Sequence, residues 1–297
     1  MTTYRILTLN AISPQGLHRF PSSRYTVGKS VDRPDAIVCR SADLHAIDIP
    51  ASVKAIGRAG AGTNNIPVAK LSERGVPVFN APGANANAVK ELVLAALLLS
   101  ARNLVPALAY VAKLDRNASD LEARVEEGKK QFAGVELPGK TLGIIGLGGI
   151  GAETARIAKG MGMKVIAYNR TKRSEAPVQL VDLDELLAAS DVVSINLVLN
   201  DETRNFLNAE RIARLKPGAI LVNTARGALV EEEAMLDALR SGHIRHAGLD
   251  VFHNEPLKAD HPLTRMENVT LSAHAAFRTR EASETLLRRA IDIVKGL

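Results

Sequence analysis

The chain has 297 residues, of which 46% are hydrophobic and 24% are charged, as in ordinary soluble globular proteins. No apolar run reaches the ~18 residues of a membrane-spanning helix, and the single cysteine, Cys39, excludes an intrachain disulfide, so we expect a cytoplasmic protein. The net charge of +6 comes from scattered Lys and Arg with few aromatic residues, which argues against nucleic-acid binding and favours small anionic ligands.

Short apolar runs alternate with helical patterns through the first third of the chain. The last two runs are followed by loops rich in Gly, Asn and Pro, AGAGTNNIP and APGANANA, as expected where parallel strands end and open α/β sheets bind ligands. A mostly apolar segment then predicts a buried helix at 88–101, and a polar helical stretch follows from about 105 to 130. The strands predicted in this part of the chain are 4–9, 36–40, 54–58 and 77–80.

The alternation begins again at Thr141, with strands predicted at 141–145, 164–168, 191–197, 219–223, 247–251 and 269–272, and helices at 149–161, 183–189, 231–240 and 279–295. This pattern is typical of a parallel sheet covered on both faces. We therefore predict an α/β protein with two doubly wound, Rossmann-like domains and a cleft between them. The first, flavodoxin-like domain comprises 1–96 plus about 285–297 and binds the substrate, and the second comprises 97–284.

A glycine-rich segment, GLGGIG at 146–151, follows an apolar strand and opens a helix, which is the context that dinucleotide binding requires. Its first glycine permits a tight turn, its second lets the backbone approach a pyrophosphate, and its third lets helix and strand pack closely. The helix N-terminus adds unpaired N–H groups and a positive dipole end. The alternative is a glycine turn that binds no nucleotide. The predicted cofactor contacts here are Gly146, Gly148, Gly149, Ile150 and Gly151.

The second strand of this unit ends at Asn169, where dinucleotide sites usually carry an acid for the ribose hydroxyls. Unlike a carboxylate, an amide does not repel a 2′-phosphate. Arg170, Lys172 and Arg173 can pair with that phosphate, and Thr171 can donate a hydrogen bond to it. These residues favour NADP over NAD as the cofactor. The alternative is a solvated basic loop that still accepts NAD.

Residues 134–141, GVELPGKT, match the spacing of a nucleotide-binding P-loop. They follow a predicted helix and lead into a strand, which reverses the order in a P-loop, and Pro138 lacks the N–H that would face a phosphate. We interpret the match as coincidental, which leaves little support for an NTPase.

Three polar segments, NTARG, DVFHNEP and SAHAA, each follow a predicted strand and can meet at one edge of the sheet. Arg226 can hold a carboxylate by two parallel hydrogen bonds and polarise the neighbouring oxygen. His274 can take a hydroxyl proton as a hydride leaves, and Glu255 can bond the other ring nitrogen. Each residue alone has a plainer alternative: a surface ion pair, a loop acid or a buried histidine. Together, on a dinucleotide-binding fold, they predict oxidation of a hydroxy acid.

The motifs GLGGIG, NTARGALV, GLDVFHNEP and SAHAA, in this order, resemble the D-isomer-specific 2-hydroxyacid dehydrogenase family over essentially the whole chain. The resemblance implies that Arg226, Glu255 and His274 are catalytic, that NAD or NADP is the cofactor, and that 102–140 is the arm of a homodimer. We also expect cofactor contacts from Thr224, Ala225, Asp250 and Ala276.

Within that family, VCRSADL, GRAGAG, FNAPGANANAVKELVLAALL and EEGKKQFAGVELPGKTLG resemble the D-3-phosphoglycerate dehydrogenases. By resemblance, the N–H groups of Ala59 and Gly60 bind the substrate carboxylate, Arg40 and Arg58 face a phosphate, and Asn85 contacts the substrate. A doubly charged phosphate favours guanidinium partners. The alternative is that both arginines pair only with local acids.

The chain departs from the family pattern close to the expected site. Ala273 stands where Pro is usual, Phe277 and Arg278 stand where a small residue and Ser or Thr are common, and Asn196-Leu197-Val198 replaces a frequent His-apolar-Pro. The leading hypothesis is oxidation of 3-phosphoglycerate to 3-phosphohydroxypyruvate, a step of serine biosynthesis. The alternatives are an NADP-dependent glyoxylate or hydroxypyruvate reductase and an NAD(H)-sensing, corepressor-like binding protein on the same fold. We expect no metal ion, nucleic acid or membrane partner.

Overall fold

The computed structural model describes residues 3–10, 12, 17–171 and 178–295, which form two compact units. One unit comprises Met1–Ala88 with Phe277–Leu297, and the other comprises Val89–Ala276. Both boundaries fall earlier than the predicted 96 and 284. At the first boundary the reason is the helix α3 (Ala86–Ala101), whose Ala96 packs on Gly248 of the second unit so closely that a Cβ on Gly248 would lie 2.9 Å from the Ala96 Cβ.

The first unit contains a parallel five-stranded sheet in the order β2-β1-β3-β4-β5. This strand order is flavodoxin-like, which agrees with the fold class that the sequence predicted for this domain. The short strand β2 was not predicted, since only four residues of mixed polarity lie at this edge of the sheet. The long helix α10 packs on β3, β4 and β5. The elements of this unit are β1 (Tyr4–Thr8), β2 (Tyr25–Gly28), β3 (Ala36–Cys39), β4 (Ala55–Arg58), α2 (Val68–Glu73), β5 (Val78–Phe79), α10 (Arg280–Lys295) and a 3-10 turn at Leu44–Ala46.

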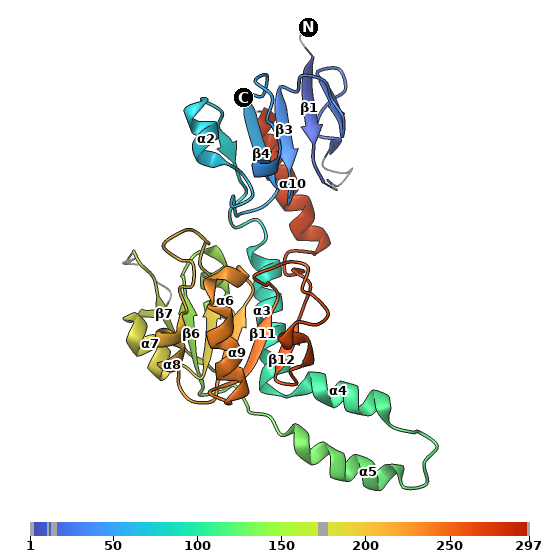
Figure 1. The fold of residues 1–297 in the computed structure, drawn as a ribbon, viewed down its shortest axis with the longest axis vertical. Coiled ribbons are helices and arrows are strands. Elements are labelled where there is room, and N and C mark those ends of the chain that lie inside the picture. Colours follow the sequence, from blue (N-terminus) through green and yellow to red (C-terminus); the bar gives the residue numbers. More distant parts are fainter. Residues whose placement is uncertain (1–2, 11, 13–16, 172–177, 296–297) are drawn as a thin grey trace. The chain divides into compact units, whose positions relative to one another are not determined.

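The second unit contains a parallel seven-stranded sheet in the order β12-β11-β10-β9-β6-β7-β8, drawn in Figure 1. The order reverses between β6 and β9, which makes their carboxyl ends the position where doubly wound sheets bind dinucleotides. The strands are β6 (Thr141–Ile145), β7 (Lys164–Tyr168), β8 (Gln179–Leu180), β9 (Val192–Ile195), β10 (Ala219–Asn223), β11 (Ile244–Leu249) and β12 (Val269–Leu271). The helices besides α3 are α4 (Leu104–Lys113), α5 (Leu121–Gly128), α6 (Gly149–Gly160), α7 (Leu183–Ala189), α8 (Ala209–Ala213) and α9 (Glu232–Arg240), with 3-10 turns at Lys129–Phe132, Gly227–Leu229 and Pro262–Arg265.

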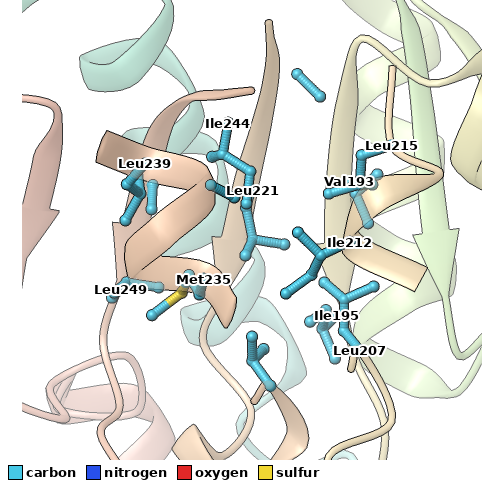
Figure 2. Close-up of a cluster of buried hydrophobic side chains, with 14 of the residues drawn as sticks. Val193, Ile195, Leu207, Ile212, Leu215, Leu221, Met235, Leu239, Ile244 and Leu249 are labelled. Carbon is cyan, nitrogen blue, oxygen red and sulfur yellow. The ribbon is translucent and has the colours of Figure 1, made fainter. Parts of the chain in front are cut away.

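The core of the second unit is aliphatic, as a chain without tryptophan requires. Figure 2 shows the cluster in which side chains of β9, β10 and β11 meet those of α8 and α9. Leu221 of β10 lies between Ile212 of α8 and Met235 of α9, and all three side chains are nearly inaccessible to water. Each such buried side chain stabilises the fold by roughly 1.5–3 kcal/mol. This core holds the strand ends in fixed positions.

The predicted helical stretch at 105–130 is two helices, α4 and α5, separated by a turn that includes Asp115. They project from the sheet of this unit as a hairpin (Figure 1). The Tyr110 hydroxyl donates to the Arg124 carbonyl at 2.6 Å, and its ring packs 5.4 Å from that of Phe132. On α4, Leu108 and Val111 expose 60% and 54% of their surface, so the hairpin carries an apolar outer face.

No single described helix is long and apolar enough to cross a membrane, and only the bent pair α3 and α4 passes that test when the two are taken together. The former P-loop match, 134–141, is a loop that leads into β6, as its sequence context indicated.

Candidate active site

The glycine-rich turn connects β6 to α6 at the point where the strand order reverses. Gly146 has a φ of +96°, and a Cβ there would lie 2.7 Å from the Asn196 carbonyl oxygen that follows β9. A Cβ on Gly151 would lie 2.2 Å from the Gly146 carbonyl oxygen. Both positions therefore admit only glycine. Backbone carbonyl groups pack closely against Gly146 and Gly151, as the sequence predicted for a tight turn and close helix–strand packing.

The front of this turn has the features that a dinucleotide needs. A Cβ on Gly148 would meet nothing within 4 Å, so this backbone is open to a ligand. The N-cap of α6 is Gly148, which has no side chain to cap the helix, so the first-turn N–H groups can bind an anion. The hydroxyl of Thr224 at the end of β10 is buried and has no hydrogen-bond partner among the described residues. A bound dinucleotide would supply partners for these groups, so the residues present fit the cofactor.

The other predicted cofactor contacts use their polar groups internally. The Ala225 N–H donates to the Asn223 side chain at 3.0 Å, and the Ala276 N–H donates to Asp250 at 2.9 Å. The Asp250 carboxylate likewise bonds to its own unit. For these three residues, the described hydrogen bonds support a role in shaping the loops, and contact with the cofactor stays a prediction.

Asn169 links the glycine-rich turn to the loop after β7. Its Oδ1 accepts from the Leu147 N–H at 3.1 Å, and its Nδ2 donates to the Thr171 carbonyl at 2.6 Å. The neighbouring Arg170 forms an ion pair with Glu202 on the surface. Its guanidinium is therefore already partnered, although exposed pairs of this kind contribute only about 0–1 kcal/mol and exchange readily. Lys172 and Arg173 lie outside the described residues, so the preference for NADP stays a prediction.

His274 and Glu255 form the centre of the site. The His274 Nδ1 lies 2.7 Å from Glu255 Oε2, and Glu255 Oε1 accepts from the Phe252 N–H at 3.1 Å. Burial raises the pKa of the Glu255 carboxyl, but hydrogen bonds from His274 and Phe252, with the charges of His274 and Arg226, outweigh burial and hold that pKa below its usual value. Glu255 is therefore a carboxylate near neutral pH, able to orient the imidazole and stabilise its protonated form.

Asp250 holds the loop that carries His274. Its side chain accepts from the Ser272 hydroxyl at 2.6 Å and from the N–H groups of Ala275 and Ala276 at 2.8 and 2.9 Å. Its backbone carbonyl accepts from the His274 N–H at 2.8 Å. His274 has a φ of +49°, a conformation that non-glycine residues rarely adopt. These bonds keep the strained loop in place, a role that sequence reasoning did not assign to Asp250.

Arg226 leaves the end of β10 through a turn built by Asn223. The Asn223 side chain is 1% exposed, donates to the Arg226 carbonyl at 2.9 Å and accepts from the Ala225 N–H. A Cβ on Gly227 would lie 2.0 Å from the Phe252 carbonyl carbon, so this turn packs directly on the segment that leads to Glu255. Burial lowers the pKa of the Arg226 guanidinium, and the charge of Glu255 acts in the opposite direction. The three predicted catalytic residues thus come together within one unit.

The predicted substrate contacts lie in the first unit. Arg40 and Arg58 follow and end the neighbouring strands β3 and β4, and Asn65 accepts from Arg58 Nε at 3.1 Å. The N–H groups of Ala59 and Gly60 donate to the Cys39 and Arg58 carbonyls at 2.8 and 2.9 Å, so their predicted role with a carboxylate gains no support from these bonds. The buried Oδ1 of Asn85 has no partner among the described residues, which is compatible with a substrate contact.

A doubly wound sheet with an open glycine turn, a His–Glu pair and a neighbouring arginine define the site of a dinucleotide-dependent oxidoreductase. Residues 108–276 match the family model described as D-isomer specific 2-hydroxyacid dehydrogenase, NAD binding domain. The chain therefore belongs to the D-isomer-specific 2-hydroxyacid dehydrogenase family, a family of oxidoreductases, and its cofactor class is NAD or NADP.

Its relatives differ in the substrates that their names give. The chain is 38% identical over 289 residues to a D-3-phosphoglycerate dehydrogenase of Archaeoglobus fulgidus, covering 93% of this chain and 52% of that protein. It is 40% identical over 275 residues to a hydroxypyruvate reductase of Thermotoga maritima, covering 91% and 85%. It thus spans about half of the first relative and most of the second.

The fold also matches a solved structure. The NADPH-dependent glyoxylate/hydroxypyruvate reductase from Sinorhizobium meliloti, in complex with NADP and malonate, has a TM-score of 0.84 and 25% identity, with 99% of this chain and 94% of that chain covered. The comparisons agree on the family and leave the substrate open.

Proposed function

We propose that this chain interconverts a D-2-hydroxy acid and its 2-oxo acid with NAD or NADP, and that 3-phosphoglycerate and 3-phosphohydroxypyruvate are the pair it favours. The observation that carries the proposal is the 2.7 Å bond between His274 Nδ1 and Glu255, held on a loop that Asp250 fixes. When bound, the nicotinamide would supply the hydride chemistry. The protein supplies the proton transfer and the charge complementarity.

The His–Glu pair determines which ring nitrogen of His274 transfers the proton. Because Nδ1 bonds to Glu255, Nε2 is the ring nitrogen that exchanges a proton with the substrate oxygen at C2. In oxidation the imidazole takes this proton and becomes positively charged. The Glu255 carboxylate, whose pKa is held low, stabilises that charge. In reduction the imidazolium returns the proton to the oxygen.

Arg226 would hold the acid. Its planar guanidinium can bond the substrate carboxylate and the C2 oxygen together, which orients C2 and stabilises the negative charge that develops on the oxygen. Its half-buried position strengthens that attraction relative to water. The buried Asn223 would keep the guanidinium aligned, since it fixes the backbone from which Arg226 projects.

The phosphate end of the substrate is the reason for preferring 3-phosphoglycerate. Arg40 and Arg58 emerge from adjacent strand ends, and a dianionic phosphate favours guanidinium partners. The likeness to the Archaeoglobus fulgidus enzyme supports this substrate. The test is to compare kcat/KM for 3-phosphohydroxypyruvate, hydroxypyruvate and glyoxylate with NADH and NADPH. The proposal expects the phosphorylated acid to be preferred at least tenfold, and equal or lower kcat/KM for it would refute this choice.

The second candidate is reduction of hydroxypyruvate or glyoxylate with NADPH. It is favoured by the 85% of the Thermotoga maritima hydroxypyruvate reductase that this chain covers, against 52% for the phosphoglycerate dehydrogenase. Asn169 in place of an acid favours NADPH in either case. The same substrate and cofactor panel separates the two candidates.

The proposal includes a homodimer that buries the apolar face of α4. Leu104, Leu108 and Val111 are exposed on this helix, which has no buried residue of its own. Exposed large apolar side chains that gather on one face mark an interaction surface. A second copy of the chain is the partner that the family resemblance implies.

A further inference from the structure

Arg40 is stacked on an aromatic ring that the family pattern does not explain. The Arg40 Cζ lies 4.5 Å from the centroid of the Phe277 ring. Phe277 precedes α10, and the Thr279 hydroxyl caps that helix by accepting from the Ala282 N–H at 3.1 Å. The cap fixes the backbone at 277–279, so the ring has a defined position. An arginine on an aromatic face is oriented without losing its charge or its N–H donors.

A second guanidinium stands beside the first. Burial lowers the pKa of Arg40, and the positive charge of Arg278 lowers it further, so the two groups are close enough to repel each other. Neither forms an ion pair with a carboxylate among the residues that the structure describes. Other arginines of this chain do so: Arg19 pairs with Asp292, and Arg280 with Glu281. Two neighbouring cations without an acid are what an anion site requires.

Arg58 adds to the positive charge at the same strand ends. It ends β4 in register with Cys39, the residue before Arg40. Its guanidinium lies against Gly60, where a Cβ would fall 1.9 Å from Nη1. Asn65 accepts from Arg58 Nε and donates to the Arg40 carbonyl at 3.4 Å, which ties the two strand ends together.

We propose that Arg278, set beside Arg40 by the ring of Phe277, is a specificity-determining residue that binds the dianionic phosphate of the substrate. This rests on the proposed function, in that the phosphate belongs to the acid oxidised at C2. Arg278 follows His274 by four residues, and four residues span at most about 14 Å. Of the candidate substrates, the phosphorylated three-carbon acid carries the dianionic group that neighbouring guanidinium groups would bind. Glyoxylate has no group for this site to bind.

The test compares Arg278→Ser with Arg280→Ser. Both variants lose one exposed arginine two positions apart, but Arg280 is paired with Glu281 and serves as the matched control. Arg278→Ser is expected to raise KM for 3-phosphohydroxypyruvate about tenfold with kcat nearly unchanged, as loss of one charge-assisted hydrogen bond predicts. KM for hydroxypyruvate and for the cofactor should stay within twofold. Arg278→Lys should restore part of the loss, and Phe277→Leu should cause a smaller one.

A binding measurement keeps this inference distinct from the proposed function. Inorganic phosphate is titrated calorimetrically into the wild type and both variants at constant ionic strength. Phosphate is expected to bind the wild type and Arg280→Ser alike and Arg278→Ser about tenfold more weakly. If the wild type prefers hydroxypyruvate but phosphate binding still depends on Arg278, the proposed substrate fails and the anion site stands. Equal phosphate binding in all three proteins, or a cofactor KM that rises in Arg278→Ser, would overturn the inference.

Discussion

Asp250→Asn should disable the enzyme without touching a reacting atom. One carboxylate oxygen accepts from both Ser272 and Ala275, and the other accepts from the Ala276 N–H. An amide that keeps the first oxygen turns an NH₂ group toward the Ala276 N–H, so one bond is lost and two donors face each other. Hydrogen bonds to charged groups contribute about 1.5–3 kcal/mol each. The variant should therefore lose about 3 kcal/mol of unfolding free energy.

The effect on turnover follows from the loop geometry. His274 has a left-handed backbone conformation that the Asp250 bonds stabilise. When these bonds are weakened, the loop should shift toward unstrained backbone conformations. A displacement of a catalytic group by about 1 Å costs on the order of 100-fold in rate. We expect kcat to fall by about that factor while the cofactor still binds.

The assay pairs steady-state kinetics with urea unfolding, and Asp237→Asn serves as the control. Asp237 is 75% exposed and pairs with Arg240 on α9, so its amide should leave both measurements unchanged. Asp250→Asn with kcat within twofold of the wild type would refute the positioning role. So would a loss of kcat that Asp237→Asn reproduces.

Three further predictions concern charge, pH and assembly. Glu255→Gln should lower kcat/KM about 100-fold. Because the pKa of Glu255 is held below its usual 4.5, the loss of wild-type activity through its protonation should have its midpoint below pH 4.5 in a pH–rate profile. His246 is buried against Thr270, and burial, with the charge of Arg245, lowers its pKa from 6.5 to about 4. Its contribution to stability is therefore complete above pH 6.5 and falls by about 3 kcal/mol as the pH drops to 4. His246→Gln should flatten this decline of the unfolding free energy in urea titrations, and an unchanged slope would contradict the prediction. Leu108→Glu should convert a dimer to a monomer in light scattering, whereas a wild-type monomer would exclude this interface.

Much of the fold follows from local patterns. The apolar strands and the glycine turn at 146–151 obey rules that act over a few residues, so both parallel sheets and the glycine turn were predicted, whereas the point where the strand order reverses came from the structure. The domain boundary was set too late because the apolar pattern of α3 does not say which sheet buries it, and the contact of Ala96 with Gly248 is distant in sequence. The edge strand β2 is too short and too mixed in polarity to be recognised.

The placement of Arg226, Glu255 and His274 in one unit was predictable because each follows a strand and belongs to a motif. The residues that hold them in position were harder to predict. Asp250 was assigned to the cofactor because its hydrogen bonds to the 272–276 loop cross more than twenty residues of chain. The ion pair of Arg170 with Glu202 and the stacking of Arg40 on Phe277 likewise join segments that no local rule connects. Only the folded backbone brings these partners together.

The central claim is that His274, oriented by Glu255, exchanges the proton at C2 while the cofactor carries the hydride. The most direct measurement is oxidation of NADH or NADPH by 3-phosphohydroxypyruvate and hydroxypyruvate, followed in the wild type and in His274→Asn, with cofactor affinity measured separately for both. The account predicts steady turnover in the wild type, a loss of at least 1000-fold in His274→Asn, and equal cofactor binding. Undiminished turnover in His274→Asn, or none in a wild type that binds the cofactor, would contradict it.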